Sequence, residues 1–499
     1  MLIRYAQHLA QGHGIVYNID EPPVDGATDF LYLMILAGLI KLGLAAHHAC
    51  IALGSLAHIM TVLVVYIANR HVHRSSTTAA FVSAGYLALG PGLSYTEASF
   101  GTTVFTFFLA LMWWGALLLL SGRATRPCEI GFACSGLLAG LTRPEGVIVS
   151  GFILLAVVLS RGVRQCVRLL IVFAIVFAVI GGAYFAWRWQ YFGQPLPNPF
   201  YVKGQQVLYP ASLIVAIRNV TRFALPFLAI MLPLGCRSKL LLKYTAITLL
   251  PVFGFTAMWM LLSNEMNYMG RFQYPILPVI LMSWAPCAAG IYGTYIKNTV
   301  HLMDSRMRSS CLVCFLLLAS TFFYTRARAI AGTPPSTRQQ GLALVAHKLS
   351  AFAGHGYTLA TTEAGLLPLY SRWRSIDAYG LNNHWIARQG GITPDYLSSM
   401  DPELIVFHDT WPQRGDPAAQ GWFRMLGILE NYVHENDFVL VAAFAGDRRH
   451  IHYYYLKADC PDYDILYNLI GSVRYYIADR EAIDISPLIS GNRQTPSMP

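Results

Sequence analysis

The chain has 499 residues, of which 55% are hydrophobic and only 12% are charged. Its mean hydropathy is +0.45, and soluble globular proteins carry roughly 25% charged residues. This composition excludes an ordinary soluble enzyme and predicts a polytopic membrane protein that has the lipid bilayer as its surroundings. No nucleic-acid partner is expected.

The nine cysteines lie mostly inside or beside apolar runs, and the polar regions show no paired cysteine spacing. This distribution predicts neither a disulfide framework nor a zinc site. Cys311 and Cys314 form a C-x-x-C pair, but the pair opens an apolar run and has no second ligand pair nearby. The sequence thus predicts no metal ligands and no certain cofactor, and it leaves open whether any activity depends on a divalent metal.

Residues 1–29 are predicted to form an extracytoplasmic loop in front of a membrane bundle. Arg4, Tyr5 and His13 lie in its first half, and Asp25 and Asp29 in its second half. Either this segment is a solvated loop with Gly and Pro turns, or its charged groups meet a lipid-linked substrate. The N-terminus either crosses the membrane unaided or is missing a first transmembrane helix, and the second explanation is favoured.

Crossing about 30 Å of hydrocarbon takes about 20 helical residues. Apolar runs of this kind lie at residues 47–69, 75–94, 100–120, 167–187, 211–234, 241–262, 273–294 and 309–325. Two shorter runs, 130–142 and 147–160, flank a polar break and are predicted to form a helical pair. The run 30–44 is either an interfacial helix or a further crossing. The sequence therefore predicts an α-helical bundle of about ten transmembrane helices over residues 30–330.

Loop charge predicts the orientation of this bundle, because cytoplasmic loops are enriched in Lys and Arg. Basic loops at 70–74, 123–126, 161–168, 237–243 and 297–308 alternate with aromatic and polar loops at 94–100, 143–146, 187–209 and 262–271. The alternation places the aromatic and polar loops, and everything after residue 326, outside the cytoplasm. The predicted location is the cytoplasmic (inner) membrane, crossed several times.

Two of the outer connectors carry arginines. At the break 141–146, Arg143 and Glu145 either neutralise each other or leave Arg143 to face a phosphate, for which its planar donor fork is suited. Arg271, at the outer mouth of the next helix, is either an interfacial anchor or a second cation for the same ligand.

A third outer connector, the loop 187–203, is rich in aromatic residues and prolines. It is either a membrane-interface belt or, through Asn198 and Lys203, part of a sugar and phosphate site. If these connectors meet at one end of the bundle, a carboxylate can act as base on an acceptor hydroxyl while cations hold a leaving phosphate. This combination favours group transfer from an anionic lipid-linked sugar.

Beyond a Gly- and Pro-rich linker at 332–336, residues 335–499 have mixed polarity and no long apolar run. A strand and turn are predicted at 358–365, a short helix at 366–371, further strands at 375–380 and 402–408, and a hairpin from 438–444 and 450–456. This pattern predicts a small extracytoplasmic α/β domain.

Segments 4–18 (RYAQHLAQGHGIVYN) and 24–31 (VDGATDFL) resemble the first outer loop of bacterial integral-membrane glycosyltransferases with the C-type fold (GT-C). Similar motifs follow in the same order at 142–146 (TRPEG), at 193–203 (GQPLPNPFYVK), at Arg271 and within 363–381. Their order is more specific than any single motif. The resemblance is greatest to the actinobacterial group that contains the terminal arabinofuranosyltransferases of arabinogalactan.

The resemblance implies transfer of a sugar, arabinofuranose in that group, from a polyprenyl-phosphate donor to a cell-envelope glycan or lipid acceptor. Together with His13, the implied donor-binding residues are Arg4, Tyr5, Arg143, Glu145, Asn198, Tyr201, Lys203 and Arg271. The acidic pair that serves as catalytic base in the family would fall before Met1, so Asp25 or Asp29 is the expected substitute. Asp29 stands where the family has Asn, and Gly101 where Glu is common.

Two other hypotheses stay open. A transporter of polyprenyl-linked glycans should have ionisable residues near the middle of its helices and internal repeats, and the sequence shows little of either. A non-catalytic membrane scaffold, a degenerate homologue without the catalytic acidic pair, would tolerate the loss of Arg143, Lys203 and Arg271.

Overall fold

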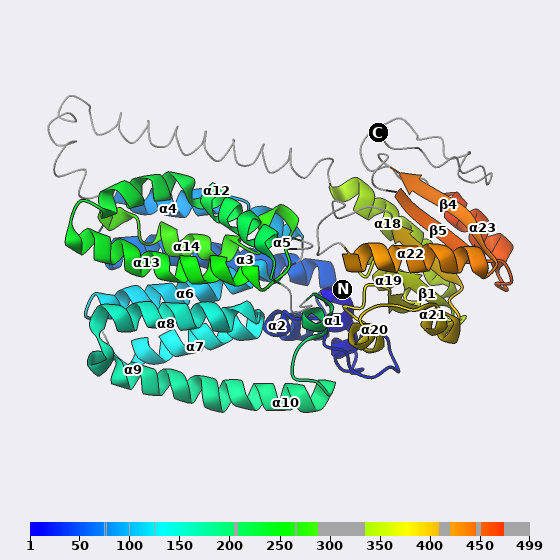
Figure 1. Ribbon diagram of the computed structural model, residues 1–499, viewed down its shortest axis with the longest axis horizontal. Helices are drawn as coiled ribbons and strands as arrows, with labels where there is room; N and C mark the ends of the chain where they lie inside the picture. The colour runs from blue at the N-terminus through cyan, green and yellow to red at the C-terminus, as the bar shows by residue number, and fades with distance from the viewer. Residues whose placement is uncertain are drawn as a thin grey trace, which may run out of the picture. The chain divides into compact units, whose positions relative to one another are not determined.

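The computed structural model describes residues 1–287 except 74, 76, 99, 124, 204–207 and 265–266, and then residues 335–408, 420–445 and 451–473. It divides into two compact units, which are described separately (Figure 1). The membrane unit comprises Thr28–Pro195 and Gln206–Ala327, and the α/β unit comprises Met1–Ala27, Leu196–Gln205 and Arg328–Pro499. The predicted crossing at 309–325, the basic loop 297–308, the C-x-x-C pair and linker residues 332–334 lie outside the described residues.

The membrane unit is a bundle of helices. They are α2 (Phe30–Lys41), α3 (Ala46–His71), α4 (Thr77–Ala88), α5 (Gly92–Glu97), α6 (Thr102–Leu120), α7 (Arg126–Thr142), α8 (Glu145–Arg161), α9 (Val163–Ile175), the π-helix η1 (Val176–Gly181), α10 (Gly182–Phe192), α12 (Pro210–Gly235), α13 (Lys239–Ala257) and α14 (Leu277–Leu281), with short 3-10 turns η2 (Met258–Met260), η3 (Tyr268–Gly270) and η4 (Tyr274–Ile276). Its core contains large buried side chains such as Trp113, Phe105 and Phe255.

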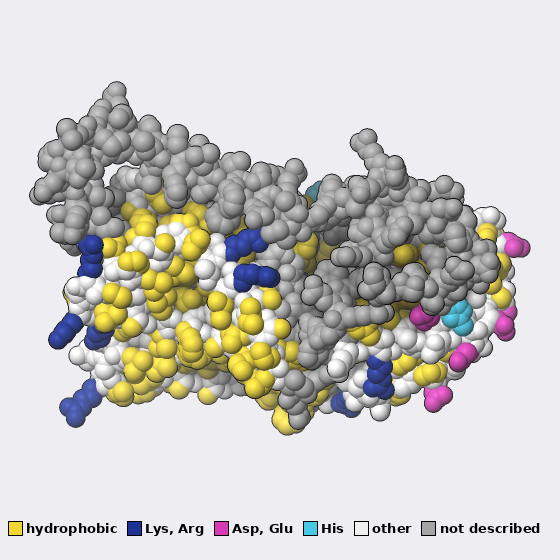
Figure 2. All heavy atoms as spheres, turned by 45° about the horizontal axis from the view of Figure 1, so that its top comes forward, with side chains coloured by type: hydrophobic (Ala, Val, Ile, Leu, Met, Phe, Trp, Pro, Cys, Tyr) yellow, Lys and Arg dark blue, Asp and Glu magenta, His cyan; other side chains and the backbone are white. Residues whose placement is uncertain are grey.

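Five helical segments among the described residues are long and apolar enough to cross a membrane: α3, α6, the continuous helix Val163–Phe192, α12 and the helix Lys239–Met260. Hydrophobic side chains cover much of the bundle face shown in Figure 2. On the continuous helix, Ile171, Ile175 and Val179 are exposed. A surface of this kind suits contact with lipid. The chain is therefore a membrane protein, and the count of about ten crossings stays a prediction.

One predicted crossing differs from the structure. The run 75–94 does not form a single span, because the helix α4 ends at Ala88 and a new short helix, α5, begins at Gly92. Pro91 lies between them, and proline disfavours a helical conformation at the residue before it. The last part of the predicted crossing 273–294, after Cys287, lies outside the described residues.

The basic connectors of the membrane unit meet one another. Arg123, after α6, donates a hydrogen bond of 2.8 Å to the carbonyl oxygen of His71 at the end of α3. Within the first half of α9, Arg168 makes two hydrogen bonds to the buried carboxylate of Glu129, which lies in the first turn of α7. The α7 helix therefore has its paired Glu129 at one end and the polar break that contains Arg143 at the other.

The α/β unit is built on a five-stranded sheet with strand order β2-β1-β3-β5-β4. The strands are β1 (Thr358–Thr361), β2 (Arg374–Asp377), β3 (Leu404–His408), β4 (Phe438–Ala445) and β5 (Ile451–Lys457). β1 pairs in parallel with β2 and β3, and β5 pairs antiparallel with β3 and β4. All the predicted strands are present, although the predicted hairpin turn 446–449 lies outside the described residues.

Helices cover both faces of this sheet. Buried residues of α18 (Pro335–Leu349), α19 (Leu366–Ser371) and α23 (Tyr463–Gly471) share one core with Leu359, Leu404 and Leu456. Residues of α20 (His384–Gln389), α21 (Pro394–Met400) and α22 (Gln420–Glu435) share another core with Ala360 and Ile405. Neighbouring residues of a strand point to opposite faces, and every residue of β1 and β3 is buried. Both faces of the sheet therefore pack against helices in a three-layer α/β arrangement. A 3-10 turn, η7 (Ser350–Phe352), follows α18.

The predicted N-terminal loop is partly helical and belongs to the α/β unit. Its first part forms α1 (Leu2–Ala10), in which Arg4, Tyr5 and Ala6 are buried. Farther along, the Asn18 side chain exchanges two hydrogen bonds of 3.0 Å with the backbone of Ser375. β2 is an edge strand, and this contact satisfies backbone groups that an edge otherwise leaves open. A loop was expected here because the segment is polar, but its buried face is visible only from the tertiary contacts.

Candidate functional site

The polar break between α7 and α8 brings Arg143 and Glu145 together. Pro144 prevents α7 from continuing, and Arg143 adopts an extended backbone after the last helical residue. A Cβ atom at Gly146 would lie 2.4 Å from the carbonyl oxygen of Ala139, so glycine is needed for α8 to begin this close to α7. The Arg143 guanidinium donates to a Glu145 carboxylate oxygen at 2.8 Å, and both side chains are largely buried.

A network of side-chain amides holds the connector that carries Arg271. Gln273 donates to the Oδ1 atom of Asn264 at 2.9 Å, and its own Oε1 atom accepts a hydrogen bond from Asn267 at 2.7 Å. Asn267 in turn accepts the backbone N–H of Phe272 at 3.0 Å. The Phe272 ring stacks on Trp259 with a centroid separation of 5.0 Å and an angle of 7°. These contacts give Arg271 a defined place next to a fixed aromatic ring.

The guanidinium groups of Arg143 and Arg271 both contact the ring of Phe272, each with its Cζ atom 4.9 Å from the ring centroid. Arg271 also lies over Phe100, at 3.6 Å. The Nε atom of Arg271 and the Oε2 atom of Glu145 are buried and have no hydrogen-bond partner among the described residues. Such polar atoms are costly to leave unpaired, and the Nε donor is suited to an anionic ligand.

Asp29 completes this group of charges. It precedes the first residue of α2 and is 7% exposed. Its Oδ2 atom accepts the backbone N–H of Gly101 at 3.2 Å. A Cβ atom at Gly101 would lie 2.5 Å from the same oxygen, so the Asp29 carboxyl occupies the space that a side chain at position 101 would need.

The pKa values of the two carboxyl groups near these arginines are shifted in opposite directions. Burial raises the pKa of Asp29, although Arg143 and Arg271 act against this shift. Burial also disfavours the charged form of Glu145, but the ion pair with Arg143 outweighs it and lowers the pKa of Glu145. Different environments for two neighbouring carboxyl groups are typical of acid–base sites.

The pKa values of the two arginines are also shifted in opposite directions. Burial, with a smaller contribution from Arg143, lowers the pKa of Arg271 to about 9. For Arg143, Glu145 and Asp29 outweigh burial and raise the pKa. Both groups are therefore charged at neutral pH. We call Asp29, Arg143, Glu145 and Arg271 the Asp29 cluster; it places two arginines near a buried carboxyl group whose pKa is raised.

The remaining predicted site residues lie in the α/β unit, not in the membrane unit. The guanidinium of Arg4 donates to the carbonyl oxygens of Tyr17, Pro368 and Trp373 and to the Asn18 side chain. These four bonds use most of its donors to hold α1 in place. Arg4 is thus committed to the packing of its own unit.

The other residues of the predicted first loop differ in exposure. Tyr5 is fully buried, and Asp25 is 5% exposed. The carbonyl oxygen of Asp25 accepts the backbone N–H of Asn198 at 3.0 Å. His13 is exposed, with its ring 6.4 Å from that of His8.

The short helix α11 (Asn198–Lys203) carries three of the predicted residues. Asn198 is fully buried, whereas Tyr201 and Lys203 are half-buried. The structure therefore groups Asp29, Arg143, Glu145 and Arg271 in one unit and Asp25 with the α11 residues in the other.

Sequence reasoning missed two features of the Asp29 cluster. Phe100 and Phe272 provide the ring faces that hold the arginines. Phe100 ends the predicted connector 94–100, and Phe272 directly follows the predicted connector 262–271. The placement of the Asp29 carboxyl over Gly101 was also missed. The glycine itself was a signal, because it leaves space beside the start of α6 that a carboxyl from elsewhere can fill.

Comparisons with known proteins identify the fold. A family model described as a domain of unknown function (DUF8728) matches residues 336–457. No curated protein matches the chain. Among solved structures, ArnT from Cupriavidus metallidurans in the apo state has a TM-score of 0.57 at 14% identity, covering 91% of this chain and 92% of that one.

Two further structures give similar results. ArnT from the same organism bound to undecaprenyl phosphate has a TM-score of 0.56 at 14% identity, with the same coverage. The archaeal oligosaccharyltransferase AglB from Archaeoglobus fulgidus, in complex with an inhibitory peptide and a dolichol-phosphate, has a TM-score of 0.50 at 12% identity, covering 95% of this chain and 72% of that one. At these identities the likeness is one of fold. The predicted GT-C fold is confirmed, and membership of the arabinofuranosyltransferase group stays a prediction.

Proposed function

We propose that the chain is a membrane glycosyltransferase that moves a sugar from a polyprenyl-phosphate donor to a hydroxyl group of a cell-envelope glycan or lipid. The Asp29 cluster carries this proposal, because it joins two buried arginines to a carboxyl with a raised pKa. The fold adds support, since the similar ArnT and AglB structures hold undecaprenyl phosphate and a dolichol-phosphate. The sequence resemblance favours arabinofuranose as the sugar and the outer face of the inner membrane as the place of transfer.

The arginines act on the phosphate. Arg143 and Arg271 bind the oxygens of the donor phosphate, and the unpartnered Nε of Arg271 supplies one hydrogen bond. Phe272 keeps both guanidinium groups oriented toward the same ligand. As the bond between the anomeric carbon and the phosphate oxygen breaks, negative charge increases on that oxygen. Cations fixed beforehand stabilise this charge without reorganisation.

Asp29 acts on the acceptor. Its carboxylate removes the proton from the acceptor hydroxyl, whose oxygen forms the new bond to the anomeric carbon, and the electron pair of the broken bond leaves with the polyprenyl phosphate. A raised pKa makes the carboxylate a better base near neutral pH. Glu145, which is paired with Arg143, orients that arginine. Asp25 lies in the α/β unit and is not assigned this role.

A transfer assay tests the proposal. The full chain, purified and placed in lipid nanodiscs, receives a polyprenyl-phosphate sugar labelled in the sugar and an envelope lipid extract as acceptor. We expect transfer by the native chain, and loss of transfer in Asp29→Asn with binding of unglycosylated polyprenyl phosphate retained. Glu129→Gln is the matched control, because Glu129 is a buried carboxylate about 20 Å away along α7.

Two outcomes would count against the proposal. If no pentose or hexose donor supports transfer while polyprenyl phosphate still binds, the scaffold hypothesis is favoured. If Asp29→Asn transfers sugar as fast as the native chain, the carboxyl at position 29 is not the base.

A further inference from the structure

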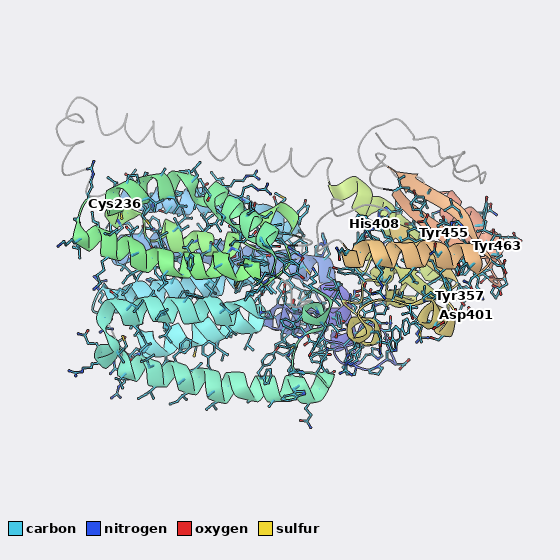
Figure 3. The ribbon with its side chains drawn as sticks, in the orientation of Figure 1. Cys236, Tyr357, Asp401, His408, Tyr455 and Tyr463 are labelled. Atoms are coloured by element: carbon cyan, nitrogen blue, oxygen red, sulfur yellow. The ribbon has the colours of Figure 1, made fainter. Side chains whose placement is uncertain are left out.

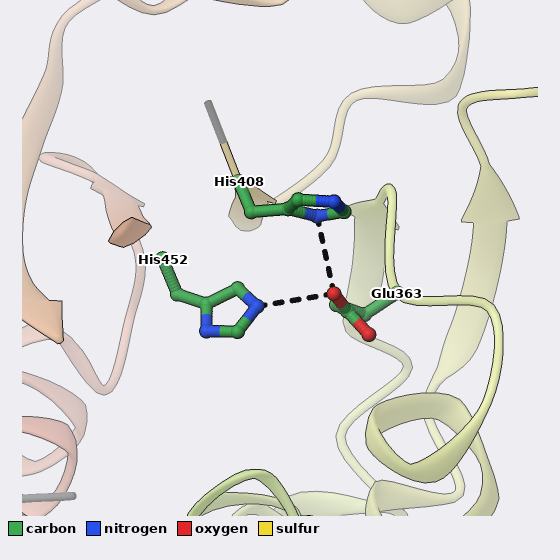
Figure 4. Close-up of side chains that lie close together, drawn as sticks. All are labelled: Glu363, His408 and His452. Carbon is green, nitrogen blue, oxygen red and sulfur yellow. Dashed lines mark hydrogen bonds and ion pairs between the residues drawn. The ribbon is translucent and has the colours of Figure 1, made fainter. Parts of the chain in front are cut away.

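Glu363, His408 and His452 form a compact cluster in the α/β unit (Figure 4). The Oε1 atom of Glu363 lies 3.1 Å from Nδ1 of His408 and 3.0 Å from Nε2 of His452. The side chains are 17%, 6% and 1% exposed, respectively. The carboxylate points between the two imidazole rings, so one oxygen faces a nitrogen of each ring.

Three neighbouring strands bring these residues together. Glu363 follows the end of β1, His408 is the last residue of β3, and His452 is paired with His408 in the register of β3 and β5. Figure 3 shows His408 at one end of β3, with Asp401, which precedes the strand, at the other end. All three potential ligands thus lie at the same end of the sheet, on backbone that the sheet hydrogen bonds hold in place.

The spacing of the donor atoms fits a metal ion. Nitrogen and oxygen ligands lie about 2.0–2.2 Å from a zinc ion, so two of them at angles between 90° and tetrahedral are roughly 2.8–3.6 Å apart. The two measured separations fall within this range, and all three donor atoms lie within 4.8 Å of one another. Two imidazoles and one carboxylate suit a first-row transition ion better than Mg²⁺ or Ca²⁺, which prefer oxygen ligands.

Further contacts orient the ligands. The ring of His408 packs on Trp422 at a centroid distance of 4.9 Å, and the backbone N–H of His408 donates to the Thr362 hydroxyl at 3.3 Å. Both contacts limit the movement of His408. The Thr362 hydroxyl also lies 3.1 Å from Nδ1 of His408, a contact that a metal ion on this nitrogen would replace.

We propose that Glu363, His408 and His452 bind one divalent transition-metal ion, with Zn²⁺ as the best fit. All three ligands fall inside residues 336–457, the segment that matches the domain of unknown function. The proposal thereby assigns metal binding to that domain. Three protein ligands leave coordination positions on the ion that water or another ligand fills.

Metal titration tests the proposal directly. The full chain is purified in detergent through an affinity tag without histidines and stripped with a chelator. It is then titrated with Co²⁺, whose visible absorption reports the coordination geometry of the bound ion, and with Zn²⁺ by calorimetry. Mg²⁺ serves as the negative metal. The variants are Glu363→Gln and His452→Gln, which keep hydrogen-bonding side chains. His355→Gln is the matched control, because His355 pairs with Asp462 at 2.7 Å elsewhere in the same unit.

We expect one Co²⁺ or Zn²⁺ per native chain and no response to Mg²⁺. Each ligand variant should bind more weakly than the native chain by over about 100-fold, because loss of an outer-sphere partner alone costs roughly 10- to 100-fold. His355→Gln should bind like the native chain. Size-exclusion elution and circular dichroism identify any variant that does not fold. If one ligand variant does not fold, metal binding by the other ligand variant tests the proposal. Absence of binding to the native chain, or equal binding by a folded ligand variant, would overturn the proposal.

Discussion

Arg271 offers a test in which stability and ligand binding are expected to move in opposite directions. The residue is buried beside Arg143, and its Nε atom has no partner among the described residues. Attraction to Asp29 and Glu145 offsets only part of the cost of burying this charge, and we expect an anionic ligand to offset more of it. Replacing Arg271 by Met keeps the apolar contact with Phe100 and Phe272 but deletes the charge. We expect Arg271→Met to melt at a higher temperature than the native chain and to bind polyprenyl phosphate more weakly.

The structure sets the size of the effect. The pKa of Arg271 falls to about 9, and each pKa unit corresponds to about 1.4 kcal/mol, so the charge costs on the order of 5 kcal/mol. The pKa of about 9 already includes the attraction to Asp29, and screening together with relaxation of the protein reduces what the variant recovers to roughly 2 kcal/mol. In a unit of this size, that change raises the melting temperature by about 4–8 °C. Loss of one charge-assisted hydrogen bond to phosphate weakens binding by about 10- to 100-fold.

Thermal unfolding in detergent, recorded over a series of polyprenyl phosphate concentrations, measures both quantities at once. The native chain should gain melting temperature with added lipid phosphate, and Arg271→Met should start higher and gain much less. Arg168→Met is the contrasting control, because it leaves the buried Glu129 without its arginine. That variant should melt at a lower temperature and respond to the lipid like the native chain.

The reasoning fails if Arg271→Met melts at a lower temperature than the native chain and responds to polyprenyl phosphate to the same extent. In that case Arg271 stabilises the bundle through its own contacts and does not bind the donor. A lower melting temperature together with a lost response would leave the binding role intact and refute the stability estimate.

Three further predictions concern other residues. Because the pKa of Asp29 is raised in the folded protein, ionisation of this carboxyl lowers the stability of the fold. Relative to Asp29→Asn, the melting temperature of the native chain should therefore fall as the pH rises above the ordinary aspartate range. Its transfer rate should fall on the acidic side of the pH profile. Gly26→Ala should destabilise the α/β unit by about 1–3 kcal/mol, since the new Cβ would lie 2.7 Å from the carbonyl oxygen of Leu381; an unchanged melting curve would refute this. Arg4→Met should lower the free energy of unfolding by about 2–4 kcal/mol, because buried groups such as the Trp373 carbonyl lose their hydrogen-bond donor. If Arg4 is a packing residue, the affinity for polyprenyl phosphate should stay within about threefold of the native value.

Much of the architecture follows from local patterns in the sequence. Apolar runs of the right length predict helices such as α3, α6 and α12, because a bilayer requires about 20 apolar residues per crossing. Alternating and apolar segments predict all five strands of the α/β unit. Arg143 and Glu145 are two positions apart across a proline break, so their contact was also within reach of sequence reasoning.

The arrangement of the sites depends on tertiary structure. Asp29 meets Gly101 and the two arginines because separate helices end at the same rim of the bundle, and no local pattern specifies which ends coincide. The sequence predicts Arg4 at a phosphate, yet Arg4 docks α1, since a guanidinium also donates to carbonyl oxygens. Glu363, His408 and His452 lie far apart in the chain, and the strand order β1-β3-β5 alone brings them together. Strand order results from packing of the whole unit, so this cluster was invisible before the fold was known.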